Sequence, residues 1–160
     1  MIESKLDLTQ YRWQEFKYEA SDDRLIHMEQ AILSYDLELG TIDFLTRWGN
    51  DGGSCPIHRH MASTSCIVME GEQHFYDYDH EKGEWKKEPR IRKTGEHGFS
   101  TGNDKHAHQE TGGPEGCVAF FHMDGNGPNP VMYEFFDDDM NMIGEVTLDM
   151  LIADYEANTQ

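Results

Sequence analysis

The chain has 160 residues, enough for a single domain with a sizeable core, and its formal net charge is −18, from 31 acidic and 13 basic residues. This excess of carboxylates disfavours nucleic acids and anionic membranes as partners, because phosphate binding requires basic patches. No apolar run has the length of a signal peptide or a membrane span, so we expect a cytoplasmic protein. Three dispersed cysteines argue against a disulfide framework: Cys55, Cys66 and Cys117.

Short strands separated by turns are predicted along most of the chain. Residues 36–40 lie between two apolar runs and predict a hairpin turn, and residues 70–72 predict a second, tight turn. The charged segment 85–93 is typical of an edge strand. The apolar or aromatic segments that we expect to form the other strands are 31–33, 42–45, 66–69, 73–79 and 117–123.

A glycine-rich connector at 95–103 and a loop at 124–130 separate the later elements. Only the segment 148–155 predicts a helix, because its larger apolar residues recur at spacings of three and four. We therefore predict an all-β fold in which residues 1–160 form a single domain. Its jelly-roll-type β-barrel core is expected over about 24–136, followed by a short C-terminal helix over about 147–156.

Two pairs of histidines carry the clearest functional signal. His58 and His60 are separated by one residue, as are His106 and His108. In a β-strand, residues two apart point to the same face, so each pair would direct two imidazoles to one side. Imidazoles converging from two strands are suited to binding a first-row metal ion.

The first histidine pair lies in a pattern that resembles the cupins, which are small jelly-roll β-barrels. Their first motif is Gly, five residues, His-x-His, three or four residues, Glu, six residues, Gly. This chain has Gly52, His58, His60, Thr64 and Gly71 at those positions. Every spacing is retained, and threonine stands where the cupins have glutamate.

The second cupin motif is Gly, five residues, Pro-x-Gly, two residues, His, three residues, Asn. Counted from Gly95, it places Thr101 and Asn103 at the Pro and Gly positions, His106 at the His position and Glu110 at the Asn position. Asparagine is a reasonable substitute for glycine there, because it tolerates left-handed backbone.

With Thr64 in place of the glutamate, the resemblance implies a three-histidine metal site formed by His58, His60 and His106. Such a site is similar to that of the acetylacetone-cleaving dioxygenases and the 2,4'-dihydroxyacetophenone dioxygenase-like cupins. The aromatic and acidic segment 74–79 resembles those proteins as well. The resemblance implies a homodimeric, mononuclear Fe(II) dioxygenase that uses O₂ to cleave a carbon–carbon bond of a small diketone or hydroxyketone.

Two further residues are predicted to assist at this site. We expect His108 to act as a base beside the ligands, with a fourth ligand or a histidine at the barrel mouth as the alternatives. We expect Thr64 to face the pocket without contacting the metal. The acidity of the chain favours a substrate that is a neutral ketone in solution.

Other functions remain open from the sequence. One is an isomerase, lyase or hydrolase that uses zinc, nickel or manganese instead of iron. Another is a non-catalytic cupin that binds a small molecule or a metal ion.

Overall fold

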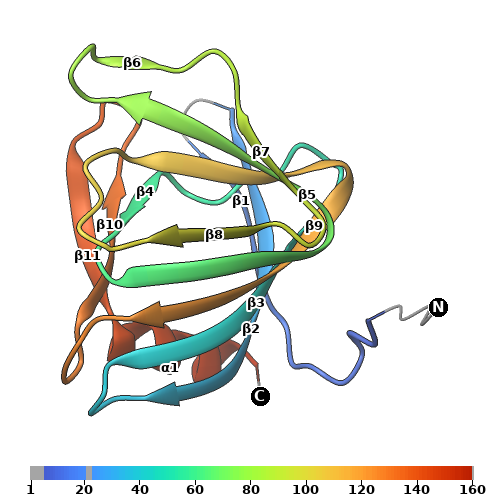
Figure 1. Cartoon of the computed structure of the whole chain (residues 1–160), viewed down its shortest axis with the longest axis vertical. Coiled ribbons are helices and arrows are strands. Elements are labelled where there is room, and N and C mark those ends of the chain that lie inside the picture. The colour runs from blue at the N-terminus through green and yellow to red at the C-terminus, as the bar shows by residue number, and fades with distance from the viewer. Residues whose placement is uncertain (1–5, 21–22, 160) are drawn as a thin grey trace.

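A computed structural model describes residues 6–20 and 23–159 (Figure 1). These residues form eleven strands and one helix, and no helix among them is long and apolar enough to cross a membrane. The elements are β1 (Gln14–Glu19), β2 (Leu25–Asp36), β3 (Thr41–Trp48), β4 (His58–His60), β5 (Ser63–Asp79), β6 (Glu84–Trp85), β7 (Arg90–Lys93), β8 (His97–Ser100), β9 (His108–Asp124), β10 (Val131–Phe136), β11 (Met142–Thr147) and α1 (Leu148–Asn158).

The strands form one curled antiparallel sheet. Its order is β1-β2-β3-β9-β4-β10-β11, and β5 pairs with β9 and also with β6, β7 and β8. Figure 1 shows the sheet closing on itself, with α1 at one end of the barrel. This arrangement confirms the predicted all-β jelly-roll barrel with a short C-terminal helix. Strands β1 and β11 lie outside the range 24–136 in which we predict the barrel core.

The first predicted turn agrees with the structure, and the second does not. The amide of Gly40 donates a hydrogen bond to the carbonyl of Asp36, which closes the β2–β3 hairpin. The expected turn at 70–72 is wrong, because β5 runs through it as a single strand. Both halves of β5 pair with β9, and the pairing register shifts on either side of Gly71, which has φ +74°. The glycine therefore marks a bulge that bends the strand without ending it.

The predicted connector at 95–103 also contains a strand. Residues 97–100 form β8, whose Gly98 lies opposite Cys66 of β5. Its pairing with β5 gives the barrel a further wall beside the first histidine pair, so this glycine-rich segment is a structural part of the site and not only a link.

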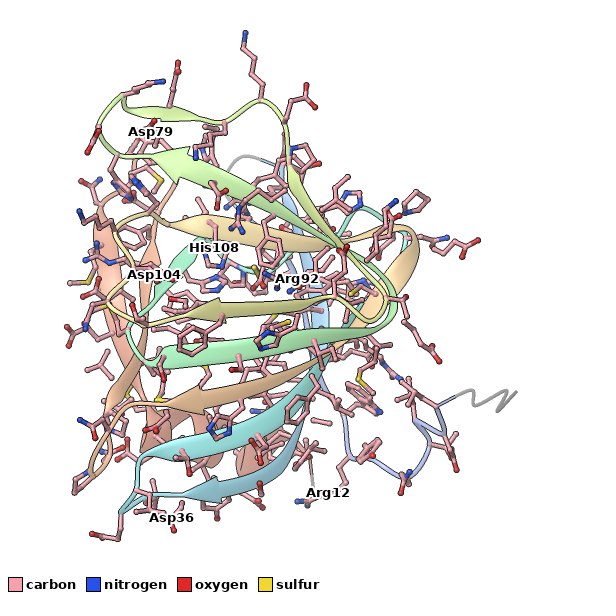
Figure 2. All side chains as sticks on the ribbon, viewed as in Figure 1. Arg12, Asp36, Asp79, Arg92, Asp104 and His108 are labelled. Atoms are coloured by element: carbon pink, nitrogen blue, oxygen red, sulfur yellow. The ribbon has the colours of Figure 1, made fainter. Side chains whose placement is uncertain are left out.

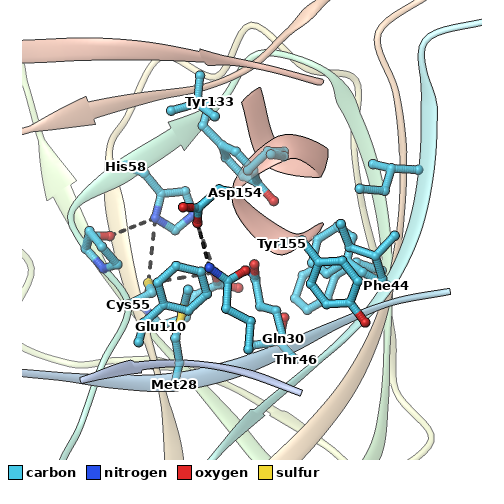
Figure 3. Close-up of a pocket in the computed structure, with 18 of the residues that line it drawn as sticks. Met28, Gln30, Phe44, Thr46, Cys55, His58, Glu110, Tyr133, Asp154 and Tyr155 are labelled. Carbon is cyan, nitrogen blue, oxygen red and sulfur yellow. Dashed lines mark hydrogen bonds and ion pairs between the residues drawn. The ribbon is translucent and has the colours of Figure 1, made fainter. Parts of the chain in front are cut away.

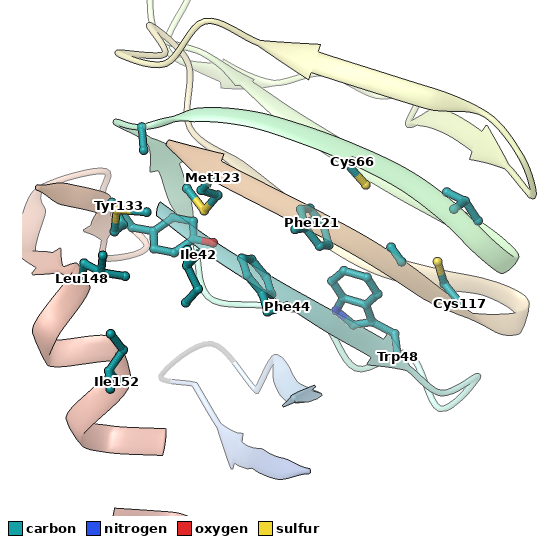
Figure 4. Packing of buried hydrophobic residues seen from close by; sticks show 14 residues of the cluster. Ile42, Phe44, Trp48, Cys66, Cys117, Phe121, Met123, Tyr133, Leu148 and Ile152 are labelled. Atoms are coloured by element: carbon teal, nitrogen blue, oxygen red, sulfur yellow. The ribbon is translucent and has the colours of Figure 1, made fainter. Parts of the chain in front are cut away.

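The hydrophobic core lies between the main sheet and α1 (Figure 4). The rings of Phe44 on β3 and Phe121 on β9 stack with their centroids 5.0 Å apart. Leu148 is completely buried and anchors the first turn of α1 against this core. Cys66 and Cys117 are free thiols in the same cluster, and burial raises the pKa of each to about 12, as expected for packing residues.

Candidate metal centre

Strand β4 brings the first histidine pair to the interior of the barrel. It is short and lies between β9 and β10. His58 and His60 point inward and are buried, whereas Arg59 between them points outward and pairs with Glu134 on β10. The alternation expected for a strand therefore holds here.

Strand β9 supplies a second pair of inward side chains at the same level. His108 is its first residue and lies directly opposite His58 in the pairing register. Glu110 follows two residues later and points to the same side. The potential ligand atoms of His58, His60, His108 and Glu110 all lie within 4.8 Å of one another, and all four residues are buried.

Hydrogen bonds from outer partners occupy the Nδ1 atoms of His58 and His60, so Nε2 is the atom that each ring can offer to a metal ion. His58 Nδ1 lies 2.8 Å from the carbonyl oxygen of Pro56, which can only accept, so Nδ1 carries the proton of the neutral ring. The Thr64 hydroxyl donates to the carbonyl of Ala62, and Thr64 Oγ1 therefore accepts from His60 Nδ1 at 2.9 Å. Each hydrogen bond fixes the tautomer of its ring, as outer partners of metal ligands commonly do.

The Nε2 atoms of the two rings face each other at a distance that requires a cation between them. His58 Nε2 and His60 Nε2 are 3.1 Å apart. Two lone pairs at this distance repel unless a proton or a metal ion lies between them. His108 Nε2 is buried and has no hydrogen-bond partner within the described chain, and its distance to Glu110 Oε2 is 3.7 Å. Three imidazole nitrogens and one carboxylate oxygen are a donor set that fits a divalent first-row ion.

The charges of the cluster are coupled to one another. Burial alone would lower the pKa of His58, but Cys55 and Glu110 outweigh it and hold that pKa well above its usual value, so His58 is protonated and pairs with Glu110 until a metal ion displaces the proton. Burial alone would raise the pKa of Glu110, but the contacts with His108 and His58 outweigh it and hold that pKa well below its usual range. Gln73 Nε2 also donates a hydrogen bond of 2.7 Å to Glu110 Oε1, which orients the carboxylate. Burial, together with the charges of His108 and His58, lowers the pKa of His60 well below its usual value. Glu110 is therefore ionised and His60 is neutral.

The structure does not bring His106, the predicted third ligand, into this cluster. His106 is exposed, and its ring stacks on that of His80 with the centroids 6.0 Å apart. It precedes β9, in an irregular segment where Ala107 and His108 are both buried and the alternation of a strand does not apply. His108, predicted as a base beside the ligands, takes the position in the cluster instead.

Glu110 is the cluster member that the sequence interpretation did not assign. Its signal was its spacing of two from His108, the same spacing that singled out His58 and His60. The structure therefore places a carboxylate among the candidate donors, although Thr64 occupies the usual glutamate position. Thr64 itself is buried behind His60 and holds that ring by its hydrogen bond.

Replacing Thr64 tests this support. We expect Thr64→Ala to bind metal about 10-fold more weakly, because losing the outer partner of a histidine ligand costs about 10- to 100-fold in affinity. Thr64→Ser keeps the hydroxyl and should remain close to the wild-type affinity. Competition against a chromophoric chelator measures both variants, and equal affinities in the alanine and serine variants would contradict this role.

An apolar cavity of about 350 Å³ opens beside the cluster (Figure 3). His58 and Glu110 line it, as do the hydrogen-bonded side chains of Gln14 and Asp154. The rest of the wall is mostly hydrophobic, with contributions from Met28, Ile32, Phe44, Phe121, Tyr133 and Leu151.

A second cavity of about 310 Å³ also reaches the cluster, through His60 and His108. Its wall contains several charged side chains from β5, β7 and the segment before β9. Glu110 and Phe121 line both cavities, so the candidate donors lie where the two cavities approach each other.

Comparison with known proteins gives similarity at the level of structure only. No protein-family model and no curated protein sequence matches the chain. A proposed acetylacetone dioxygenase from Methylibium petroleiphilum has a TM-score of 0.66 and 14% identity, over 97% of this chain and 95% of that chain. An acetylacetone dioxygenase from Acinetobacter johnsonii has a TM-score of 0.65 and 14% identity, over 99% and 94%. An RmlC-like cupin protein from Ralstonia eutropha has a TM-score of 0.64 and 14% identity, over 96% and 85%.

Proposed function

Because the chain has the cupin fold, we propose that His58, His60, His108 and Glu110 hold one divalent metal ion, Fe(II), in an oxygen-dependent enzyme. The proposed reaction is cleavage of a carbon–carbon bond in a small diketone or hydroxyketone. The observation that carries the proposal is geometric: three imidazoles and one carboxylate, all buried, have their potential ligand atoms within 4.8 Å of one another. The fold similarity to two structures described as acetylacetone dioxygenases supports the choice of reaction.

The ion, when bound, would act as a Lewis acid on the two oxygens of the ketone and provide a place for O₂. The chain's own residues define what else the site does. The apolar wall formed by Met28, Phe44 and Phe121 would hold the hydrocarbon part of the substrate and exclude water from it. His58 and Glu110 line that cavity, so the oxygens of a ketone seated there would reach the cluster.

Glu110 and His108 change two details of the chemistry expected from the sequence. A carboxylate donor reduces the net charge of a dicationic site to +1, so binding of an anionic enolate is less strongly favoured than at a three-histidine site. His108 would use its free Nε2 as a ligand, so this nitrogen could not also accept the substrate proton. The predicted role of His108 as a base is therefore replaced by a role as ligand.

Oxygen consumption tests the proposal. Protein loaded anaerobically with Fe(II) is mixed with 2,4-pentanedione or with an aryl 2-hydroxyketone, and O₂ uptake and acid release are measured together. We expect uptake in proportion to acid released. Zinc-loaded protein is the matched control, since zinc is expected to occupy the same donors but has no redox chemistry.

The outcome separates the proposed reaction from the other cupin functions. Fully iron-loaded protein that consumes no O₂ across a panel of such ketones would contradict the dioxygenase. Retention of stoichiometric metal in that case would favour an isomerase, lyase or hydrolase, or a non-catalytic binding protein.

A further inference from the structure

The second cavity concentrates positive charge in a strongly acidic protein. Four of the 13 lysine and arginine residues of the chain line its 310 Å³, although the formal net charge of the chain is −18. These residues are Lys86, Arg90, Arg92 and Lys105. The carboxylates in the wall are Asp77, Asp104 and Glu110. The formal charge of the cavity wall is therefore positive, whereas that of the whole chain is negative.

Arg90 and Arg92 are two residues apart on β7 but differ in their partners. Arg90 is neutralised by Asp77, with two hydrogen bonds of 2.6 and 2.9 Å to the two carboxylate oxygens. Arg92 has no carboxylate within ion-pair distance among the described residues. Its Nη1 donates a hydrogen bond of 3.1 Å to Gln73 Oε1, and the guanidinium also interacts with Cys66, so these two contacts use only part of its five N–H donors.

The surroundings hold the Arg92 guanidinium in place inside the cavity. It lies over the ring of Phe75, 4.8 Å from the centroid. On the side of β8, a Cβ atom on Gly98 would lie 1.9 Å from Arg92 Nη2, so the absence of a side chain there makes room for the guanidinium. Figure 2 shows Arg92 and His108 among the strands of this half of the barrel. A partly buried, fixed guanidinium is suited to binding a planar anion.

We propose that the second cavity binds a small carboxylate through Arg92, with the hydrocarbon part of the ligand against Phe121. The planar guanidinium matches a carboxylate with two parallel hydrogen bonds. The aromatic rings in the wall favour an organic acid over an inorganic anion. The candidate donors His60, His108 and Glu110 also line this cavity, but the proposed contacts, Arg92 and Phe121, are not among those donors. Under the proposed function, the carboxylate belongs either to the acid that is released or to a ketone substrate that also carries a carboxylate.

Direct titration tests the site without metal or O₂, so its result does not depend on the proposed reaction. Sodium benzoate is titrated into the full-length chain after metal removal, at constant ionic strength, and binding is followed by NMR and calorimetry. Benzamide is the neutral ligand of the same shape. We expect benzoate to bind at least about 10-fold more tightly than benzamide, as expected for hydrogen bonds to a charged group.

Three variants locate the binding. Arg92→Gln should weaken benzoate binding by about 10-fold or more. Lys82→Gln removes the same charge outside the cavity wall and should bind benzoate about as well as the wild type. Gly98→Ala keeps every charge but displaces the guanidinium, and it should weaken benzoate binding by a larger factor than benzamide binding.

Unchanged benzoate affinity in Arg92→Gln and Gly98→Ala would overturn the proposal, and Gly98→Ala decides alone if Arg92→Gln does not fold. Tighter binding of inorganic phosphate than of benzoate would also overturn it. Zinc-loaded protein then separates the two sources of the carboxylate. The affinity of each ligand is compared between zinc-loaded and metal-free protein. If zinc increases the affinity for benzoylformate more than the affinity for benzoate, the substrate carries both a ketone and a carboxylate. If zinc increases both affinities equally, the carboxylate belongs to the released acid.

Discussion

Replacing His108 by alanine is expected to remove the bound metal, whereas replacing His106 by alanine leaves the metal content close to that of the wild type. His108 contributes a buried nitrogen to the cluster, and His106 is exposed beside His80. Loss of an outer partner alone weakens metal ligands by about 10- to 100-fold, so loss of a donor should cost at least about 100-fold. Metal per protein is measured by mass spectrometry after reconstitution and dialysis.

The two variants are matched controls for each other, because they remove the same side chain from positions two residues apart. Circular dichroism establishes that both are folded. If His106→Ala lost the metal and His108→Ala kept it, the assignment from the cupin motif would hold and the cluster on β9 would not be the metal site.

Replacing Gly71 by alanine is expected to destabilise the protein by about 3 kcal/mol or more, while Gly95→Ala should cost about 1 kcal/mol. Both glycines have positive φ, +74° and +84°, so both variants bear the cost of left-handed backbone. A Cβ on Gly71 would also lie 2.1 Å from the carbonyl oxygen of Gly116, whereas one on Gly95 meets nothing within 4 Å. Urea denaturation of the two variants measures the difference.

This comparison isolates the close approach of β5 and β9 at the bulge. The obstructing atom belongs to the backbone of a paired strand and cannot move aside as the end of a side chain could. Equal free energies of unfolding for the two variants would show that the bulge relaxes at little cost.

Most residues of the candidate site could be predicted from the sequence, but the residue at which β9 begins could not. His58, His60 and Thr64 could be predicted because their cupin-like spacing falls on the short strand β4 and on the start of β5, which follows it directly. His106 and His108 share the same spacing, and only the start of β9 at His108 shows which ring is inside. That boundary depends on pairing with His58, a contact between residues 50 positions apart, which no local pattern encodes.

The fold class could be predicted from the sequence, but the course of individual strands could be predicted less well. Alternating short strands with one apolar helical segment were sufficient for the barrel and for α1. The turn expected at 70–72 rested on Glu70-Gly71-Glu72, a combination of residues that suits a turn and a bulge equally. Pairing of both halves of β5 with β9 decides between them, and this is again a contact distant in sequence.

The bulge at Gly71 also determines which side chains of β5 can serve the candidate metal centre. Thr64 supports His60, and Gln73 supports Glu110, from opposite sides of the bulge. Their positions differ by nine, an odd number, so a regular strand would turn them to opposite faces of the sheet. Burial along β5 shows the change directly, since the buried residues before Gly71 are the even-numbered Thr64, Cys66 and Val68, and those after it are the odd-numbered Gln73 and Phe75. A single strand thus supports two candidate donors because one extra residue reverses its alternation.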